Sequence, residues 1–415
     1  MIRNYLTLAW KVLLRRKFFT FISLFGICFT LVVLVLVTAL LDHIAGQYPP
    51  ETRQDHTVGI YFASLRGEHW RRNGFAGFAL IDKCARDLPN VERLGIASLP
   101  NGVFSYLNGQ RVKSWIKRTD GNYWQILDFQ FVEGGPFTAD DVRNGRMVAV
   151  INEATRQRFF GGGPAVGRTL EADGQRFTVI GVVPNVPILR WVPFADIWVP
   201  YTTAKSDAYK REWVGDFMGL LLLKDPSKLA LTRDELWSRL KAVQIDEPKG
   251  MQSLDATPET LWDTIGRMFV GDGTGAGTGY GRRLQIFLAI AAGLFMLLPA
   301  VNLVNLNTSR IMERASEIGV RKAFGASSLT LVWQFVVENV FLTLVGAALG
   351  FVLAAAVLRV INGSGLILYA ELHLNYRIFG WGVLMAVVFG LLSGVYPAWR
   401  MSRLHPVQAL KGASR

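Results

Sequence analysis

Residues 18–41 read FFTFISLFGICFTLVVLVLVTALL, a run of 24 residues without a charged side chain. A helix needs about 20 apolar residues to cross the hydrocarbon core of a bilayer, because each residue adds about 1.5 Å of length. A secretory signal peptide has a shorter apolar region, of about 7–15 residues. The run therefore predicts a retained membrane-spanning helix and places the chain among membrane proteins.

Three more apolar runs follow, at residues 284–308, 329–358 and 378–398, and only the middle one contains a charge, Glu338. We therefore predict a helical membrane protein with four transmembrane helices. A large extracytoplasmic α+β domain is expected between the first and second of them. The expected segments are a cytoplasmic interfacial helix (1–17), the spans (18–41, 284–308, 329–358 and 378–398), the inserted domain (42–283), a cytoplasmic coupling helix (309–328), an extracytoplasmic loop (359–377) and a cytoplasmic tail (399–415).

Basic residues near the apolar runs predict the orientation. Arg3, Lys11 and the cluster Arg15–Lys17 precede the first run. Because Lys and Arg beside a span stay on the cytoplasmic side, both termini are expected in the cytoplasm. The net charge of +13 does not indicate nucleic-acid binding, since basic residues beside spans contact anionic lipid headgroups.

Neither a disulfide nor a metal site is expected. The two cysteines, Cys28 and Cys84, fall in the first span and in the inserted domain, so they cannot pair in this topology. The five histidines have no metal-ligand spacing. We therefore expect no metal and no bound cofactor in this chain.

The inserted domain shows the alternating strand, helix and hairpin patterns of an α+β fold. We predict helices at 78–87, 153–160 and 232–243, strands at 147–151 and 218–223, and a hairpin turning at Asp173–Gly174. Thr232 is the expected N-cap of the last helix. The 241 residues from 43 to 283 are many for one core, so two lobes are predicted.

Six glycines in residues 271–281 predict a flexible tether into the second span. A phosphate-binding loop would need the string G-x-x-x-x-G-K-[ST], which occurs nowhere in the sequence. We therefore expect that this chain does not hydrolyse ATP.

Between the second and third runs, residues 310–325 read RIMERASEIGVRKAFG. On a helical period Arg310, Glu313, Arg314, Glu317 and Arg321 fall within one narrow arc, in which Glu317 and Arg321 form an i,i+4 pair. A helix of this kind at the membrane surface is suited to contact a cytoplasmic partner. A solvated charged helix without such a role is the alternative.

The segment closely resembles the coupling region of ABC transporter permeases of the MacB/FtsX type, where E-I-G-V-R-K-A-x-G-A-S is typical. Residues 317–327 read EIGVRKAFGAS, and residues 396–411, YPAWRMSRLHPVQALK, are similar to the ending of the same family. Residues 145–200, which begin GRMVAVINEATRQRFFG, are similar to the periplasmic core domain of MacB-like permeases.

The resemblance implies a permease of the bacterial inner membrane that forms a homodimer or heterodimer and binds two cytoplasmic ABC ATPase subunits, which hold ATP and magnesium. Because only residues 1–17 precede the first span, the ATPase is expected to be a separate chain. The implied ATPase contacts are Arg310, Glu313, Arg314, Glu317, Arg321 and Lys322.

Three functions stay open from the sequence. The first is export of a peptide, antibiotic or siderophore, with or without a periplasmic adaptor and an outer-membrane channel. The second is lipoprotein release. The third is a regulator that moves no solute and activates a cell-wall hydrolase.

Polar residues within the spans indicate helix contacts. A charge in the bilayer is costly, so Glu338 is expected to face the helix bundle or to be neutralised. The resemblance, in which the family's Q-F-x-x-E pattern is matched by Gln334, Phe335 and Glu338, favours a packing or conformational role over a proton relay. Asn302 and Asn305 predict hydrogen bonds between helices in preference to an ion site. Gly346 and Gly350 provide the third span with a face of small residues for close packing.

Overall fold

The computed structural model describes residues 17–107, 110–243, 251–270, 279–313 and 327–402, together with the single residues 7, 10, 11, 14, 15, 320 and 324. The chain divides into two compact units. The helical unit comprises residues 1–43, 287–366 and 372–415, and the inserted domain comprises residues 44–286 with the short segment 367–371.

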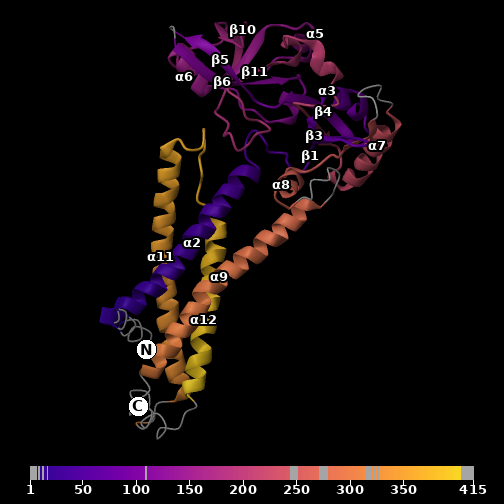
Figure 1. Cartoon of the computed structure of the whole chain (residues 1–415). Coiled ribbons are helices and arrows are strands. Elements are labelled where there is room, and N and C mark those ends of the chain that lie inside the picture. The colour runs from indigo at the N-terminus through magenta and orange to yellow at the C-terminus, as the bar shows by residue number, and fades with distance from the viewer. Residues whose placement is uncertain are drawn as a thin grey trace. The chain divides into compact units, whose positions relative to one another are not determined.

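Long apolar helices form the helical unit: α2 (Lys17–Ala45), α9 (Tyr280–Glu313), α11 (Ser328–Ser364) and α12 (Tyr376–Ser402) (Figure 1). Within the described residues, Lys17–Ala45, Tyr280–Leu297 and Val332–Ser364 are long and apolar enough to cross a membrane, and Tyr376–Leu392 is a shorter apolar helix. Helices therefore occur at all four predicted runs, while the number that cross the bilayer stays a prediction.

Helix α11 packs closely against α2 at two glycines. A Cβ atom at Gly346 would lie 2.9 Å from Cγ2 of Ile27, and one at Gly350 would lie 3.4 Å from the carbonyl oxygen of Cys28. Ile27 is buried there with Leu342. The small-residue face predicted for this span is thus a helix contact: a side chain at Gly346 would crowd Ile27, whereas a Cβ atom at Gly350 would be in ordinary contact with α2.

The inserted domain is built around a sheet. Its strands are β1 (Thr57–Ile60), β2 (Phe62–Gly67), β3 (Arg71–Ala76), β4 (Val91–Ser98), β5 (Asn101–Leu107), β6 (Gln110–Thr119), β7 (Glu133–Gly134), β8 (Val148–Asn152), β9 (Thr169–Ala172), β10 (Gln175–Val183), β11 (Ile197–Pro200), β12 (Val214–Gly215), β13 (Phe217–Leu223) and β14 (Met251–Ala256). Its helices are α3 (Phe78–Leu80), α4 (Tyr123–Ile126), α5 (Ala139–Arg143), α6 (Glu153–Phe160), α7 (Leu229–Ala242) and α8 (Leu261–Val270), with single turns η1 (Ile81–Ala85), η2 (Tyr201–Thr203), η3 (Asp207–Arg211) and η4 (Pro226–Lys228).

In the part of the domain that the structure describes, all strands hydrogen-bond in one network, in the order β14-β2-β3-β13-β4-β6-β11-β8-β10-β7, with β1, β5, β9 and β12 paired beside this path. Most neighbours are antiparallel, but β8 with β10 and β6 with β11 are parallel. This mixed, mainly antiparallel sheet with helices agrees with the α+β domain that the sequence predicts.

Local sequence signals explain several elements. The predicted turn is confirmed, since Asp173 and Gly174 have φ of 54° and 66° and join β9 to β10, as a two-residue hairpin requires. Helix α6 begins where the Asn152 side chain accepts a hydrogen bond from the N–H of Thr155, and it ends at left-handed Gly161. The predicted strands 147–151 and 218–223 appear as β8 and β13.

The start predicted for the helix after β13 is wrong. Helix α7 begins at Leu229, and Thr232 is buried within its first turn instead of capping it. Asp225 accepts a hydrogen bond from the N–H of Ser227 and is followed by Pro226, so a single turn leads directly into α7. The turn at Asp225 and Pro226 therefore starts the helix before Thr232.

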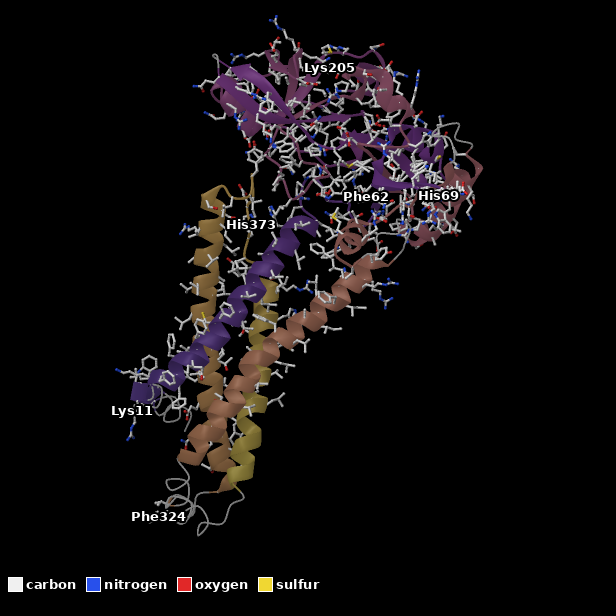
Figure 2. The ribbon with its side chains drawn as sticks, in the orientation of Figure 1. Lys11, Phe62, His69, Lys205, Phe324 and His373 are labelled. Atoms are coloured by element: carbon white, nitrogen blue, oxygen red, sulfur yellow. The ribbon has the colours of Figure 1, made fainter. Side chains whose placement is uncertain are left out.

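The domain core has three clusters of buried apolar side chains, around Leu221, Trp198 and Phe177. Lys205 is one of the charged side chains at the domain surface (Figure 2). Because the clusters share one strand network, the division into two lobes stays a prediction.

Candidate functional site

The charged segment between the second and third helices is described only at its ends. Arg310 and Glu313 continue α9 as helical backbone, while Arg314, Glu317, Arg321 and Lys322 lie outside the described residues. Helix α11 then begins after Ser327, whose hydroxyl accepts a hydrogen bond from the N–H of Thr330. The coupling role of this segment therefore stays a prediction.

Glu338 lies in α11 with only 5% of its surface exposed, and Asn339 and Thr343 of the same helix are also buried. A Cβ atom at Gly390 of α12 would lie 2.8 Å from the Thr343 hydroxyl oxygen, so α11 and α12 approach closely one turn away. Glu338 is thus buried within the helical unit. This position is favoured because a charged side chain exposed to lipid is costly. Asn302 and Asn305 belong to α9, with side chains outside the described part.

An ion pair, which we call the α2 junction, lies where the chain passes from α2 into the inserted domain. The Arg190 guanidinium donates to the Glu51 carboxylate at 2.8 Å and to the carbonyl oxygens of Tyr48 and Pro49 at 2.7 and 3.0 Å. Burial raises the pKa of Glu51, and the positive charge of Arg190 opposes that rise. The pair is therefore a buried cross-link between the residues that follow α2 and residue 190.

A second buried cation lies next to the α2 junction. The ammonium group of Lys117 is fully buried and donates to the carbonyl oxygens of Trp191 and Val192. Burial lowers the pKa of Lys117 well below its ordinary value, while the Glu51 carboxylate opposes this. Hydrogen bonds to carbonyl oxygens compensate part of the cost of burying this group.

The chain returns toward the membrane helices through the α9 junction. Asp263 of α8 accepts a hydrogen bond from the N–H of Gly281 at 3.1 Å and pairs with Arg233 of α7 at 3.2 Å. A Cβ atom at Gly266 would lie 2.3 Å from the carbonyl oxygen of Tyr280, so α8 lies directly against the first turn of α9. The beginning of α9 is thus held against the domain by the hydrogen bond from Gly281 to Asp263 and by the close approach of Gly266 to Tyr280.

A third connecting segment, the Tyr369 junction, comes from the loop between α11 and α12. The Tyr369 hydroxyl donates to the Asp196 carboxylate at 2.8 Å, and the N–H of Ile188 donates to the carbonyl oxygen of Leu368 at 3.1 Å. Burial raises the pKa of Tyr369 to about 12, so its hydroxyl stays a donor at neutral pH. Its φ of 58° is a left-handed conformation that residues other than glycine adopt at an energetic cost.

Asp196 organises the receiving side of the Tyr369 junction. Its carboxylate also accepts hydrogen bonds from the N–H of Trp115 at 2.8 Å and from the Asn152 amide at 3.1 Å. Three donors from three elements hold one carboxylate, which makes it a rigid receptor for the tyrosine.

Sequence reasoning did not find these junctions. Glu51 and Arg190 are 139 positions apart, and Asp196 and Tyr369 are 173 apart, so no spacing pattern connects them. The only local signal is the position of Glu51 soon after a span. Among the residues that the structure describes, no group of three or more His, Cys, Asp or Glu could hold a metal ion.

Comparison with known proteins gives matches at both ends of the chain. A model described as MacB-like periplasmic core domain matches residues 20–238, and one described as FtsX-like permease C-terminal matches residues 289–406. The macrolide export ATP-binding/permease protein MacB of Wolinella succinogenes is 25% identical over 414 residues, covering 97% of this chain and 60% of that protein.

Two further similarities are smaller in extent. The uncharacterized ABC transporter permease YknZ of Bacillus subtilis is 22% identical, covering 86% of this chain and 85% of that protein. The crystal structure of the periplasmic region of MacB from Actinobacillus actinomycetemcomitans aligns at 16% identity with a TM-score of 0.39, covering 53% of this chain and 94% of that one. The chain thus spans less than two thirds of the length of the Wolinella relative.

Proposed function

This chain belongs to the MacB/FtsX-like family of ABC transporter permeases, and we propose that it couples ATP hydrolysis on a separate ATPase to movements of its inserted domain. Its apolar helices and its family make it a multi-pass protein of the inner membrane. We place both termini in the cytoplasm, because basic residues lie beside the first span and such residues stay on the cytoplasmic side of the membrane.

The observation that best supports this coupling is that the inserted domain binds each of its connecting segments through specific polar contacts. Arg190 holds the residues after α2, Asp263 holds the start of α9, and Asp196 holds Tyr369. Buried, charge-assisted contacts of this kind resist separation more strongly than exposed ones. A displacement of a connecting helix would therefore move the domain instead of being absorbed in a loose loop.

The ATPase is proposed to be a partner because the sequence contains no G-x-x-x-x-G-K-[ST] string. ATP and magnesium would then be held by the partner. Its contacts would be the charged side chains that precede α11, namely Arg310, Glu313, Arg314, Glu317, Arg321 and Lys322. A second permease subunit would complete the assembly.

Export is the favoured activity because the Wolinella relative is named as a macrolide export protein. We propose an antibiotic, peptide or siderophore-like cargo, delivered with or without a periplasmic adaptor and an outer-membrane channel. Glu338, Asn302 and Asn305 would serve helix contacts during the movement, not the passage of ions.

The test is reconstitution of the chain with its ATPase in lipid vesicles, followed by measurement of ATP turnover and cargo transport. Charge reversal by Glu317→Lys or by Arg321→Glu is expected to abolish turnover stimulation, since lost charge pairs at a contact cost about 2–5 kcal/mol. The chain purified alone is expected to hydrolyse no ATP.

The swapped variant E317K/R321E is the matched control, because it restores the i,i+4 pair within the helix but presents reversed charges to a partner. If the residues dock the ATPase, the swap does not rescue turnover. Full rescue by the swap, or normal turnover in both single variants, would contradict the docking role.

A further inference from the structure

The C-terminal end of helix α8 exposes three consecutive apolar side chains on the inserted domain. Met268, Phe269 and Val270 have exposed fractions of 59%, 77% and 39%. The preceding turn of the helix, residues 263–266, is buried. A contiguous group of exposed apolar side chains marks a surface that contacts another molecule or a membrane.

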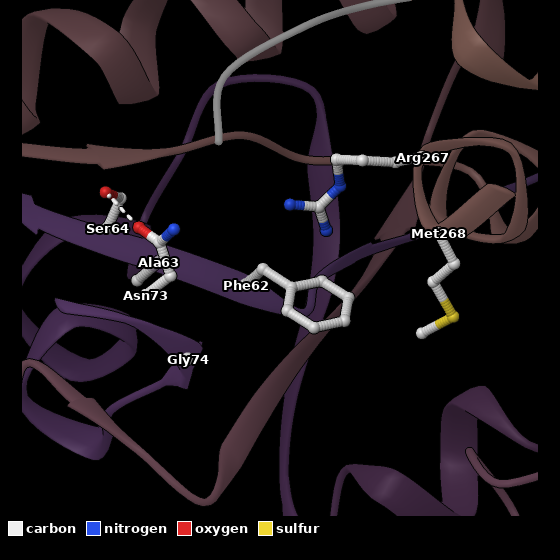
Figure 3. Close-up of a pocket in the computed structure, with 7 residues that line it drawn as sticks. All are labelled: Phe62, Ala63, Ser64, Asn73, Gly74, Arg267 and Met268. Carbon is white, nitrogen blue, oxygen red and sulfur yellow. Dashed lines mark hydrogen bonds between the residues drawn. The ribbon is translucent and has the colours of Figure 1, made fainter. Parts of the chain in front are cut away.

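Contacts on the other side of α8 hold this helix in place. The helix borders a cavity of about 210 Å³ beside strands β2 and β3, with Met268 among the lining residues (Figure 3). Arg267 lies over the Phe62 ring, 4.1 Å from its centre, and 3.1 Å from the Glu259 carboxylate. Because these contacts fix the rotation of α8, a simple turn of the helix cannot bury Met268 and Phe269.

Helix α8 also lies against the first turn of α9, the helix that continues as the second predicted span. The N–H of Gly281 donates to Asp263 at 3.1 Å, and a Cβ atom at Gly266 would lie 2.3 Å from the carbonyl oxygen of Tyr280. In Figure 1, α8 is seen along its axis while α9 runs across the picture, so α8 crosses the start of α9 steeply. A helix that lies in the plane of a membrane surface has this relation to a helix that crosses the membrane.

The residues of α9 indicate where the surface of the membrane lies. Arg282 and Arg283 are exposed, and residues 284–297 contain no charge. Ile286 and Phe287 are the first exposed large apolar side chains after the arginines. Because arginines stay at the headgroups and apolar side chains enter the hydrocarbon, the hydrocarbon begins near residue 284.

Helix α8 is therefore at the level of the lipid headgroups. It contacts residues 280 and 281, which precede residue 284 by about 5–6 Å of helix. The headgroup layer on each side of a bilayer is about 5–8 Å thick. The exposed end of α8 follows within one turn of Gly266, so it is close enough to this layer to enter it.

The two arginines supply charges that anionic headgroups match. Among the residues that the structure describes, no acid pairs with Arg282 or Arg283. Asp263, which contacts the same turn of α9, is paired with Arg233 at 3.2 Å. Apolar side chains beside unpaired cations are typical of helices that bind anionic membranes.

We propose that the end of α8 inserts into the leaflet on the side of the inserted domain. Met268 and Phe269 then lie at the boundary between headgroups and acyl chains, and Arg282 and Arg283 contact the phosphates of anionic phospholipids. The domain is thus attached to the membrane surface at α8 as well as through its spans. This attachment does not involve the ATPase, so it is measurable in the permease alone.

The test labels single cysteines with a bimane fluorophore, in the full chain without Cys28 and Cys84, in phosphatidylglycerol nanodiscs. Lipids with a nitroxide near the headgroup are the quencher. Quenching at Phe269→Cys is expected to be about threefold or more above that at Val166→Cys, because an inserted side chain lies about 5–10 Å deep in the headgroup and acyl boundary. Val166 is the matched control, since it is apolar, 44% exposed and next to Gly134 of β7, at the end of the strand order opposite to β14 and β2.

Equal quenching at the two positions would overturn the proposal. Protection of the label at position 269 from both the lipid quencher and aqueous iodide would also overturn it, because a second copy of the chain would then cover the end of α8.

A second measurement tests the arginines. Quenching at position 269 is expected to be about twofold stronger in phosphatidylglycerol than in phosphatidylcholine, because arginines near an anionic surface are attracted to it. R282Q/R283Q is expected to abolish this difference, whereas R176Q/R211Q, which removes two exposed arginines elsewhere on the domain, keeps it. A difference that persists in R282Q/R283Q would refute the headgroup contacts.

Discussion

The Glu51 carboxylate and the Arg190 guanidinium form a buried ion pair at 2.8 Å, with side-chain exposures of 7% and 5%. The pair fixes the residues that directly follow α2 to the interior of the inserted domain. Such a contact is stable only while both partners are present, because either charge alone would be left in a poorly solvated site.

Replacing Glu51 by alanine is therefore expected to destabilise the chain by about 3–5 kcal/mol. The thermal unfolding midpoint in detergent measures this. Arg86→Ala is the control, because Arg86 pairs with Asp82 at the surface, with side-chain exposures of 54% and 37%. A surface pair of this kind contributes about 0–1 kcal/mol, so equal effects of the two variants would contradict the assignment of Glu51.

Tyr369→Phe removes the hydroxyl that donates to Asp196, and it is expected to loosen the segment 367–371 from the domain. The hydrogen bond from Ile188 N–H to Leu368 depends on that segment, so the Ile188 amide should exchange its hydrogen faster. Hydrogen exchange with mass spectrometry measures this. Tyr376→Phe, at a position that is 73% exposed, should leave exchange at Ile188 unchanged.

Gly346→Leu is expected to separate α11 from α2, because even a Cβ atom there would lie 2.9 Å from Ile27. Overpacking of this kind costs about 1–3 kcal/mol. Gly363→Leu in the same helix is the control, since a Cβ atom at Gly363 would have nothing within 4 Å. Comparison of the unfolding midpoints tests the contact, and equal midpoints for the two variants would show that the α2–α11 approach is not close.

Glu259 should make stability depend on pH. Burial raises the pKa of Glu259 from 4.5 to about 7, and the Arg267 charge opposes the rise. Because the folded state binds this proton more tightly than the unfolded state, the contribution is fully present below pH 4.5 and is lost as pH rises through about 7.

The loss amounts to about 3 kcal/mol at most. Unfolding midpoints measured between pH 5 and 8 should therefore fall less in Glu259→Gln than in the unaltered chain. An identical pH profile in the two proteins would argue against a titrating Glu259.

Topology can be tested by labelling single cysteines, placed in a background without Cys28 and Cys84, with an impermeant thiol reagent in intact cells. Glu171→Cys, on exposed β9, is expected to react, because the inserted domain is predicted outside. Glu171 is preferred to Asp173, whose carboxylate bonds Arg118 and Lys205. Ser316→Cys is expected to stay unlabelled, and its labelling would reverse the orientation.

Part of this fold follows from short stretches of sequence. The apolar run 18–41 predicts α2, because length and composition alone decide whether a helix can cross a bilayer. The turn at Asp173–Gly174 and the end of α6 at Gly161 follow from backbone conformations that these residues adopt easily. The wrong prediction at Thr232 has an equally local cause, since the turn at Pro226–Lys228 starts α7 before Thr232.

The sequence by itself therefore determined the apolar helices, the position of the inserted domain and the family. The α2 and Tyr369 junctions were decided only by the tertiary structure. Glu51 meets Arg190 across 139 positions, and Arg267 meets Phe62 from a different element. Local propensities depend on neighbours within a few residues, whereas a buried ion pair or a cavity depends on how distant segments pack against one another, which no single stretch of sequence encodes.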